Sequence, residues 1–316
     1  MMDNSTFQQA IRSVSFPIPG SNLERVEYKL SVKKKYEGLN IIDFFCYAVP
    51  RSTPEHWREK VVTGNLKVNN HPVSPDYTVS AGDLTSHISE PRTEPDVNIN
   101  IDLIYACPDF WVLNKPSPLP MHASGRFVRN TLIHILELAF PDEDFKMIHR
   151  IDANTTGIVV VGKNREAANF LRQQFENKSI RKEYLALVEG VVTNDQMNLL
   201  QSIGQEVVSG GGRKIDTTGK KAETGIEVLE RRENETLLKV TPLTGRTNQI
   251  RLHLAESGHP IVGDLGHKNP KYFENNPFTY DDDSLFLHAY KITLQHPGNK
   301  EDMTFVAPVP EKFNWN

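Results

Sequence analysis

The sequence predicts an α+β protein of two domains. Its 316 residues leave room for about two domains and for a sizeable hydrophobic core. Helix-type and strand-type patterns follow one another in mixed order, and the strand-type stretches come in hairpin-like pairs, which favours α+β over a doubly wound sheet. A polar, proline-punctuated segment from Pro91 to Pro95 separates a shorter N-terminal half from a longer C-terminal half. We therefore expect a flexible arm over residues 1–20, a small domain over 21–95 and a larger domain over 96–316.

The composition indicates a cytoplasmic protein without membrane contact. Hydrophobic residues make up 38% and charged residues 24% of the chain, as in ordinary globular proteins. No apolar run approaches the length of a membrane span, and the N-terminus lacks the pattern of a secretion signal. Cys46 and Cys107 have no CxxC spacing and no nearby histidine in the sequence. We expect each to be a small buried hydrophobe, and we expect no metal or other cofactor.

The shorter half shows two helix patterns and two strand patterns. Residues 1–20 are polar and then rich in proline, which is typical of a frayed arm. Ser52 or Thr53 can cap a helix that has Pro54 in its first turn and Gly64 after its end. The elements expected here are helices over residues 41–49 and 54–63, a strand over 66–68, a turn at 69–70 and a strand region over 73–88 that is broken at 82–83.

The longer half alternates strands and helices. The elements expected there are strands over residues 99–113 with a break near 108–109, a helix over 131–140, a strand over 158–161, a helix from 164 onward, strands over 181–192 and 226–242, and a helix over 249–256. Gly258 and Pro260 follow the last of these helices, as is common at helix ends. A spacing of three to four residues among the apolar side chains after Asn164 indicates core packing.

One loop of the longer half carries more charge than a core needs. Ile158 to Val161 are four β-branched residues without polar alternation, which predicts a strand buried on both faces. His149, Arg150 and Asp152 lie in the loop before it. Rigid scaffolds commonly present reactive groups from such loops. By itself the pattern fits a carboxylate-centred site of unknown chemistry and a solvated turn equally well.

Four blocks of the longer half resemble one family. His149-Arg150-Ile151-Asp152 and the residues up to Gly157 resemble the motif HRLD-x-x-T-S/T-G of the RluA-type pseudouridine synthases. Three further blocks resemble the same family in its own order, at residues 181–188, 244–253, and 285–289 with 296–297. The resemblance implies a pseudouridine synthase fold with a mixed, largely antiparallel central sheet. It also implies an isomerase that converts uridine in RNA into pseudouridine without a cofactor, because the reaction involves neither redox change nor phosphate transfer.

The same resemblance assigns roles to five residues. Asp152 matches the family's essential aspartate, which either attacks as a nucleophile or removes a sugar proton. Tyr184 matches the active-site tyrosine, whose ring could stack on the uracil. Arg251 is expected to pair with Asp152, because a guanidinium offers a carboxylate a bidentate and permanently charged partner. Arg150 is expected to fill the gap that the flipped base leaves in the RNA, or else to contact phosphate, and Arg246 is expected to contact phosphate.

The chain departs from the family pattern at a few positions. Ile151 for leucine and Thr156 for serine are mild changes. Asn248 stands where the family usually has a histidine, so the hydrogen bonding at that position stays open.

The small domain is expected to bind RNA. It resembles the small RNA-binding domain that a ribosomal small-subunit protein shares with aminoacyl-tRNA synthetases, and a generic helix–strand appendage is the alternative. The net charge of −4 argues mildly against RNA, but binding needs only a local basic face. Candidate contacts are Lys33, Lys34, Lys35, Arg58, Lys60 and Lys67. We expect a monomer that acts on tRNA somewhat more readily than on ribosomal RNA.

Competing functions lack the residues that they require. The chain has no G-x-G-x-x-G, DFG or APE motif of a kinase, and the glycines at 210–212 and 219 lack the spacing of a phosphate-binding loop. His253 and His259 are six residues apart, with Gly258 between them, and make no metal pair. An RNA-binding or RNA-chaperone protein that retains the fold without turnover is the alternative from another class. Such a protein would have no need of Asp152, Tyr184 and Arg251 together.

Overall fold

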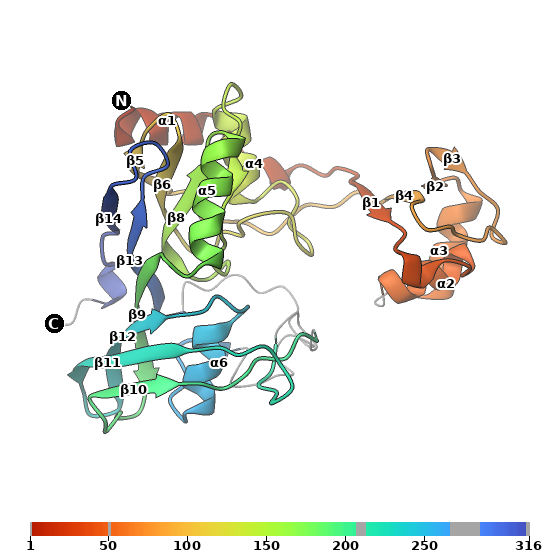
Figure 1. The fold of residues 1–316 in the computed structure, drawn as a ribbon. Helices are drawn as coiled ribbons and strands as arrows, with labels where there is room; N and C mark the ends of the chain where they lie inside the picture. Colours follow the sequence, from red (N-terminus) through yellow and green to blue (C-terminus); the bar gives the residue numbers. More distant parts are fainter. Residues whose placement is uncertain (1, 50–51, 207–212, 266–284, 314–316) are drawn as a thin grey trace. The chain divides into compact units, whose positions relative to one another are not determined.

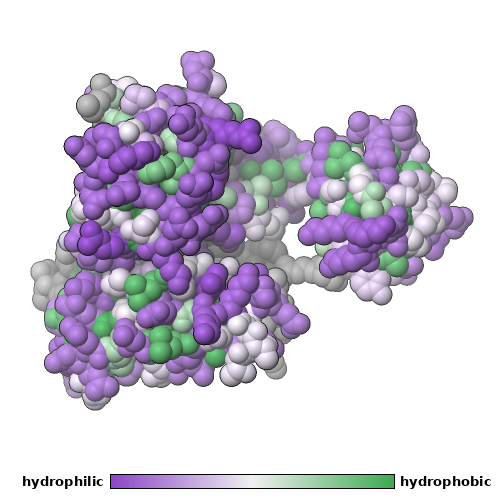
Figure 2. All heavy atoms as spheres, in the orientation of Figure 1, coloured by the Kyte–Doolittle hydropathy of each residue, from purple (hydrophilic) through white to green (hydrophobic). Residues whose placement is uncertain are grey.

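The computed structural model describes residues 2–49, 52–206, 213–265 and 285–313. It divides into two compact units (Figure 1): a small unit, Asn22–Thr93, and a large unit, Met1–Ser21 with Glu94–Asn316. The glycine run at 210–212 lies outside the described residues. Hydrophilic side chains dominate the face of each unit seen in Figure 2, and apolar side chains appear there in small groups. In the described part of the chain no helix has the length and apolar character needed to cross a bilayer.

The small unit packs two helices on a four-stranded antiparallel sheet. The strands β1 (Glu27–Ser31), β2 (Leu66–Val68), β3 (His71–Pro72) and β4 (Leu84–Ile88) lie in the order β1-β4-β2-β3. The helices α2 (Ile41–Ala48) and α3 (Pro54–Val62) begin after Asn40 and Thr53, whose side chains accept backbone N–H groups of the first turns. The single-turn 3-10 helix η2 covers Lys34–Tyr36. Phe45 and Trp57 stack at 4.4 Å in the core between the helices and the sheet.

The strand pattern of this unit differs from the prediction. Strand β1 was not predicted, and β3 lies before the expected start of the second strand region at residue 73. Only Leu84–Ile88 of the region 73–88 forms a strand. The Asp83 carboxylate accepts hydrogen bonds from the Ser80 backbone N–H, the Asn69 amide and the Tyr77 hydroxyl. These bonds hold the preceding residues in turns, and side-chain competition of this kind cannot be seen in a hydrophobic pattern.

The large unit is built on a ten-stranded sheet. Its strands are β5 (Asp102–Ala106), β6 (Phe110–Lys115), β7 (Lys146–Met147), β8 (Thr156–Gly162), β9 (Arg181–Glu189), β10 (Gln196–Leu199), β11 (Thr224–Arg231), β12 (Glu235–Pro242), β13 (Leu287–Gln295) and β14 (Asp302–Val306). The order is β10-β11-β12-β9-β13-β8-β6-β5, with β7 on β8 and β14 on β13. Among the described strands, β13 and β8 are parallel and the other pairs antiparallel. The predicted α+β fold with a mixed, largely antiparallel sheet is therefore confirmed.

In the described part of the large unit the α-helices are α1 (Asn4–Val14), α4 (Leu132–Ala139), α5 (Arg165–Glu176) and α6 (Gln249–Glu256). The side chains of Thr131 and Asn164 cap α4 and α5, at the positions where the sequence predicts helix starts. Short 3-10 turns, η1 (Pro19–Ser21) and η4 (Glu311–Phe313), lie near the two ends of the chain.

Strand β8 crosses the middle of the sheet, and all seven of its residues are buried. It begins at the point where it pairs with β13, and Gly157 lies there with φ of +104°. A Cβ atom at Gly157 would lie 2.3 Å from the Ala289 carbonyl oxygen, so only glycine fits. The loop that precedes β8 is thus fixed to the neighbouring strand at its last turn.

The prediction of a flexible arm over residues 1–20 is wrong. Residues 4–14 form α1, capped by Asp3, whose carboxylate accepts the Thr6 backbone N–H at 2.9 Å. Phe7 is fully buried against Trp111 and Phe140, with ring centroids 5.8 and 5.4 Å apart. Phe7 and Ile11 are one helical turn apart and form a short apolar stripe. Polar residues outnumber them in this segment, and for that reason the sequence pattern did not indicate a packed helix.

Candidate active site

A pocket of about 450 Å³ opens beside the loop that precedes β8. Its walls come from that loop, from β9, from the C-terminal end of α5 and from the segment that joins β12 to α6. The residues that line it and carry the argument below are Arg150, Asp152, Phe175, Lys182, Tyr184, Arg246, Asn248 and Arg251. The structure therefore brings together the five residues to which the resemblance assigns roles in the catalytic domain.

Asp152 is held in place by a buried lysine behind its loop. The Lys115 side chain is fully buried, and its ammonium donates to the carbonyl oxygens of Pro116, Leu119 and Ala153 at 2.8–2.9 Å. Because Ala153 directly follows Asp152, this clamp fixes the backbone at the carboxylate. The Asp152 side chain itself is 25% exposed, so its carboxylate can meet a molecule in the pocket.

Arg251 lies between two carboxylates. Its Nη1 is 3.2 Å from Oδ2 of Asp152, while its Nε and Nη2 donate to the two oxygens of Asp264 at 2.8 and 2.7 Å. The Asp264 side chain is 1% exposed. Burial alone would lower the pKa of Arg251, but the hydrogen bonds and charge of Asp264, followed by those of Asp152, raise it. The guanidinium is thus permanently charged and held in one orientation toward Asp152.

Asn248 provides a second donor to Asp152. With its amide oriented by the hydrogen-bonding network, Nδ2 of Asn248 donates to Oδ2 and Oδ1 of Asp152 at 3.0 and 3.3 Å. Asn248 immediately precedes α6 and has φ of +56°, a left-handed conformation that asparagine tolerates better than most residues. The position that departs from the family pattern thus holds a neutral donor against the carboxylate.

Tyr184 reaches the pocket from the middle of β9. Burial raises the pKa of its hydroxyl, and the negative charge of Asp152 raises it further. The hydroxyl therefore stays protonated at neutral pH. The ring adds an aromatic surface to the pocket close to the Asp152 carboxylate.

His149 has a structural place in the same loop. Its Nε2 accepts the Val160 backbone N–H at 2.9 Å, and its ring stacks on Phe175 with centroids 4.5 Å apart. Burial, with a smaller contribution from the charge of Lys182, lowers the pKa of His149 to about 3. The imidazole is therefore neutral and ties the loop to β8. Arg150, the next residue, is exposed at the pocket, as is Arg246 from the β12–α6 segment.

Most of the basic residues predicted to contact RNA in the small unit are accessible, and Lys60 is the exception. The Lys60 side chain is 7% exposed, and its ammonium contacts the Glu90 carboxylate. This burial, with the Glu90 carboxylate just after β4 as its partner, argues against the expected RNA contact of Lys60. Of the other candidates, Lys33, Lys34, Lys35 and Arg58 are exposed and Lys67 is half-buried.

Three residues of the site were not found from the sequence. Asp264 follows Gly263 in a short loop, and nothing local distinguishes it from a surface acid. Lys115 ends a strand of otherwise mostly apolar residues, and a charged residue in such a strand is a sign of a buried polar role. Lys182 lies two residues before Tyr184, in a block whose resemblance to the family points only to the tyrosine.

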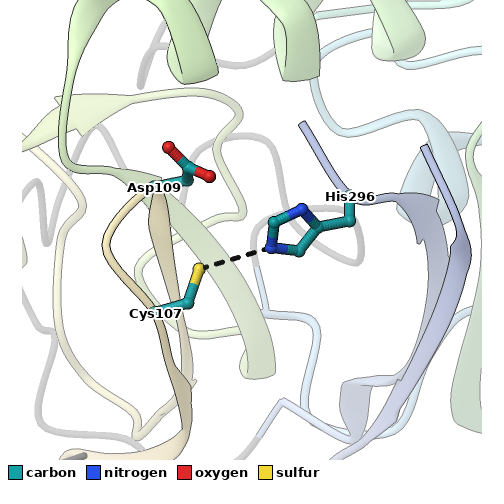
Figure 3. Close-up of side chains that lie close together, drawn as sticks. All are labelled: Cys107, Asp109 and His296. Atoms are coloured by element: carbon teal, nitrogen blue, oxygen red, sulfur yellow. Dashed lines mark hydrogen bonds between the residues drawn. The ribbon is translucent and has the colours of Figure 1, made fainter. Parts of the chain in front are cut away.

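A second polar cluster lies on other turns of the large unit. Cys107, Asp109 and His296 come together there, so Cys107 is half-buried beside a histidine and is not an isolated hydrophobe (Figure 3). The Gly298 backbone N–H donates to Nδ1 of His296 at 3.0 Å, which leaves the proton on Nε2, 3.8 Å from the Cys107 sulfur. The Cys107 thiol in turn donates to the Phe110 carbonyl oxygen. Binding a metal through Nε2 of His296 would require the proton on Nδ1 instead, and it would require a Cys107 thiolate facing a carbonyl oxygen. We therefore interpret these hydrogen bonds as contacts that hold neighbouring turns together.

Comparison with known proteins agrees with this geometry. A family described as RNA pseudouridylate synthase matches residues 109–256. The ribosomal large subunit pseudouridine synthase C of Yersinia pestis is 32% identical over 290 residues, which cover 86% of this chain and 89% of that protein. The enzyme of the same name from Vibrio vulnificus is 33% identical over 86% of this chain and 90% of its own length.

The structure of human RNA pseudouridylate synthase domain containing 1 has a TM-score of 0.56 and 28% identity, and covers 70% of this chain and 89% of that one. The sequence relatives exceed 30% identity along most of the chain. This chain therefore belongs to the RNA pseudouridylate synthase family, whose members are isomerases that act on RNA.

Proposed function

We propose that this chain converts uridine to pseudouridine in structured RNA, with Asp152 as the catalytic carboxylate. The observation that carries the proposal is the place of Asp152 in the pocket. It has two oriented donors, Arg251 and Asn248, and an aromatic wall from Tyr184. Such donors hold a carboxylate in one orientation.

The reaction breaks the glycosidic C–N bond, turns the uracil and rejoins it to the sugar through carbon 5. In this reaction, Asp152 either attacks C1′ of the ribose or removes the proton from C2′. The two routes differ in an isotope effect: deuterium at C2′ slows the reaction only if that C–H bond breaks. No step requires redox or phosphate transfer, and we propose that the reaction needs no cofactor.

Tyr184 and the two exposed arginines act on the base and the backbone. A uridine within stacked RNA must leave the stack before a carboxylate can reach its sugar. We assign to Tyr184 the face on which the flipped uracil stacks and a hydroxyl directed at the reacting base. Arg150 would fill the vacated place in the RNA stack or hold a neighbouring phosphate, and Arg246 would hold a phosphate.

The small unit supplies further RNA contacts in this proposal. Lys33, Lys34, Lys35 and Arg58 are exposed, and their charge suits a phosphate backbone. We also propose that the enzyme acts as a monomer.

Two observations bear on the RNA target. The resemblance of the small unit favours tRNA, whereas the relatives from Yersinia and Vibrio are named for the ribosomal large subunit. Mapping pseudouridine in cells that lack the protein, complemented with wild type or Asp152→Asn, decides between them. We expect defined sites to disappear, to return with wild type and to stay absent with Asp152→Asn.

Binding of RNA separates the proposal from its alternative. The Asp152→Asn protein should retain RNA affinity within a few-fold of wild type, because the substitution removes the reacting carboxylate and no cation. If no site disappears in cells that lack the protein, the chain is an RNA-binding member of the family without turnover.

A further inference from the structure

Lys182 lies in the pocket beside Tyr184 and is not used by the proposed reaction. The two residues are two apart in β9, so their side chains leave the same face of the strand, about 7 Å apart along it. Their neighbours in the strand leave the opposite face, where Arg181 lies 3.8 Å from Asp302 and Glu183 lies 3.3 Å from Lys291.

The ammonium of Lys182 has an aromatic neighbour and no acceptor among the described residues. It lies 5.8 Å from the ring centroid of Phe175, and no ion pair or hydrogen bond is formed by it in the described part of the chain. Burial alone lowers its pKa. Neither carboxylate of the pocket pairs with Lys182. Asp152 pairs with Arg251, and Glu176 is exposed at the rim, outside ion-pair distance of Lys182.

Other buried lysines of this chain have acceptors. Lys60 contacts the Glu90 carboxylate, and Lys115 donates to three carbonyl oxygens. Burial removes part of the water from the Lys182 ammonium, and no protein acceptor among the described residues replaces that water. Uncompensated groups of this kind are concentrated at sites where a ligand supplies the missing partner.

We propose that Lys182 binds a phosphate of the RNA next to the target nucleotide. The proposal rests on the proposed function, because it assumes that a uridine enters the pocket with its backbone attached. With the uracil on Tyr184, a phosphate one step along the backbone comes within reach of the ammonium. Arg150 and Arg246 are exposed at the rim and can meet any passing strand, whereas Lys182 meets only a strand that has entered the pocket.

The test is the salt dependence of RNA binding. Each phosphate neutralised by a protein cation adds about 0.7 to the slope of log Kd against log salt for single strands. Lys182→Met retains the stem that packs on Phe175 and removes the charge, so we expect Kd for a short oligouridine strand to rise roughly tenfold and the slope to fall by about 0.7. Lys182→Arg retains the charge and should retain the slope.

Arg181→Met is the matched control, since it removes a cation from the adjacent position on the opposite face and should leave the slope unchanged. All variants are also measured in the Asp152→Asn background, where turnover is absent. An unchanged slope for Lys182→Met overturns the proposal, even if Kd rises, because Lys182 would then only support the pocket wall. If the slope falls while wild type forms no pseudouridine in cells, the phosphate contact stands and the proposed reaction fails.

Discussion

The substitution Asp264→Asn tests whether catalysis depends on the residue behind Arg251. Asp264 is 1% exposed, does not line the pocket and accepts two hydrogen bonds from the Arg251 guanidinium at 2.7 and 2.8 Å. Asparagine has nearly the same volume, but it removes the charge and replaces one acceptor with a donor. Arg251 then keeps Asp152 as its only carboxylate partner among the described residues.

The size of the effect follows from these contacts. Removing one partner of a buried ion pair destabilises a protein by about 3–5 kcal/mol. Because Asp152 remains at 3.2 Å, we expect the lower end, a loss of about 3 kcal/mol in the free energy of unfolding. A charge-assisted hydrogen bond to Asp152 that is no longer held in place is worth about 2 kcal/mol. At about 1.4 kcal/mol per factor of ten, the rate at saturating RNA should fall about 30-fold.

The assay is single-turnover formation of pseudouridine at saturating RNA, with urea unfolding and RNA affinity measured on the same protein. Glu94→Gln is the matched control, because Glu94 is equally buried and accepts the backbone N–H groups of residues 128–130 away from the pocket. It should lose a similar amount of stability and keep its rate. A folded Asp264→Asn protein with a rate within twofold of wild type would refute the positioning role of Asp264.

Three further predictions concern the fold and the small unit. Gly157→Ala should lower the free energy of unfolding by about 3 kcal/mol or more, measured in urea, since the new Cβ would meet the Ala289 carbonyl oxygen at 2.3 Å. Burial lowers the pKa of His288 from 6.5 to about 4, so the unfolded chain binds the extra proton first as the pH falls. The stability of the wild type should be complete above pH 6.5 and about 2 kcal/mol lower at about pH 5 from this histidine alone, and His288→Gln should show a smaller loss across that range. Joining Ser21 to Glu94 removes the small unit at a point where the Glu94 N–H donates to the Gly20 carbonyl oxygen at 2.8 Å. RNA affinity should then fall more than tenfold with the catalytic rate at saturation nearly kept, and an unchanged Kd would remove RNA binding from the small unit.

The sequence predicts best where chemistry and local pattern coincide. The capping residues Thr53, Thr131 and Asn164 begin helices because their side chains satisfy N–H groups of the turn that follows, an interaction confined to neighbouring residues. Asp152 and Arg251 are 99 residues apart and meet at 3.2 Å. Their pairing could be predicted only because the family blocks carry it, and no local pattern connects them.

The features that the sequence did not predict depend on distant residues, because in each case the tertiary fold supplies the partner. The apolar stripe of α1 has meaning only against Trp111 and Phe140. Lys60 is a basic residue of the kind that contacts RNA, but its side chain is buried beside Glu90, which follows β4. Asp264 is an ordinary acid in the sequence and acquires its place only when Arg251 lies beside it.

The position of α1 also has a consequence for synthesis of the chain. Helix α1 belongs to the large unit, yet the whole small unit lies in the sequence between α1 and the rest of the large unit. Phe7 leaves the ribosome about 100 residues before Trp111, the ring on which it packs. The small unit can therefore fold during synthesis while the apolar stripe of α1 is still uncovered, and α1 can dock only after the small unit has been made.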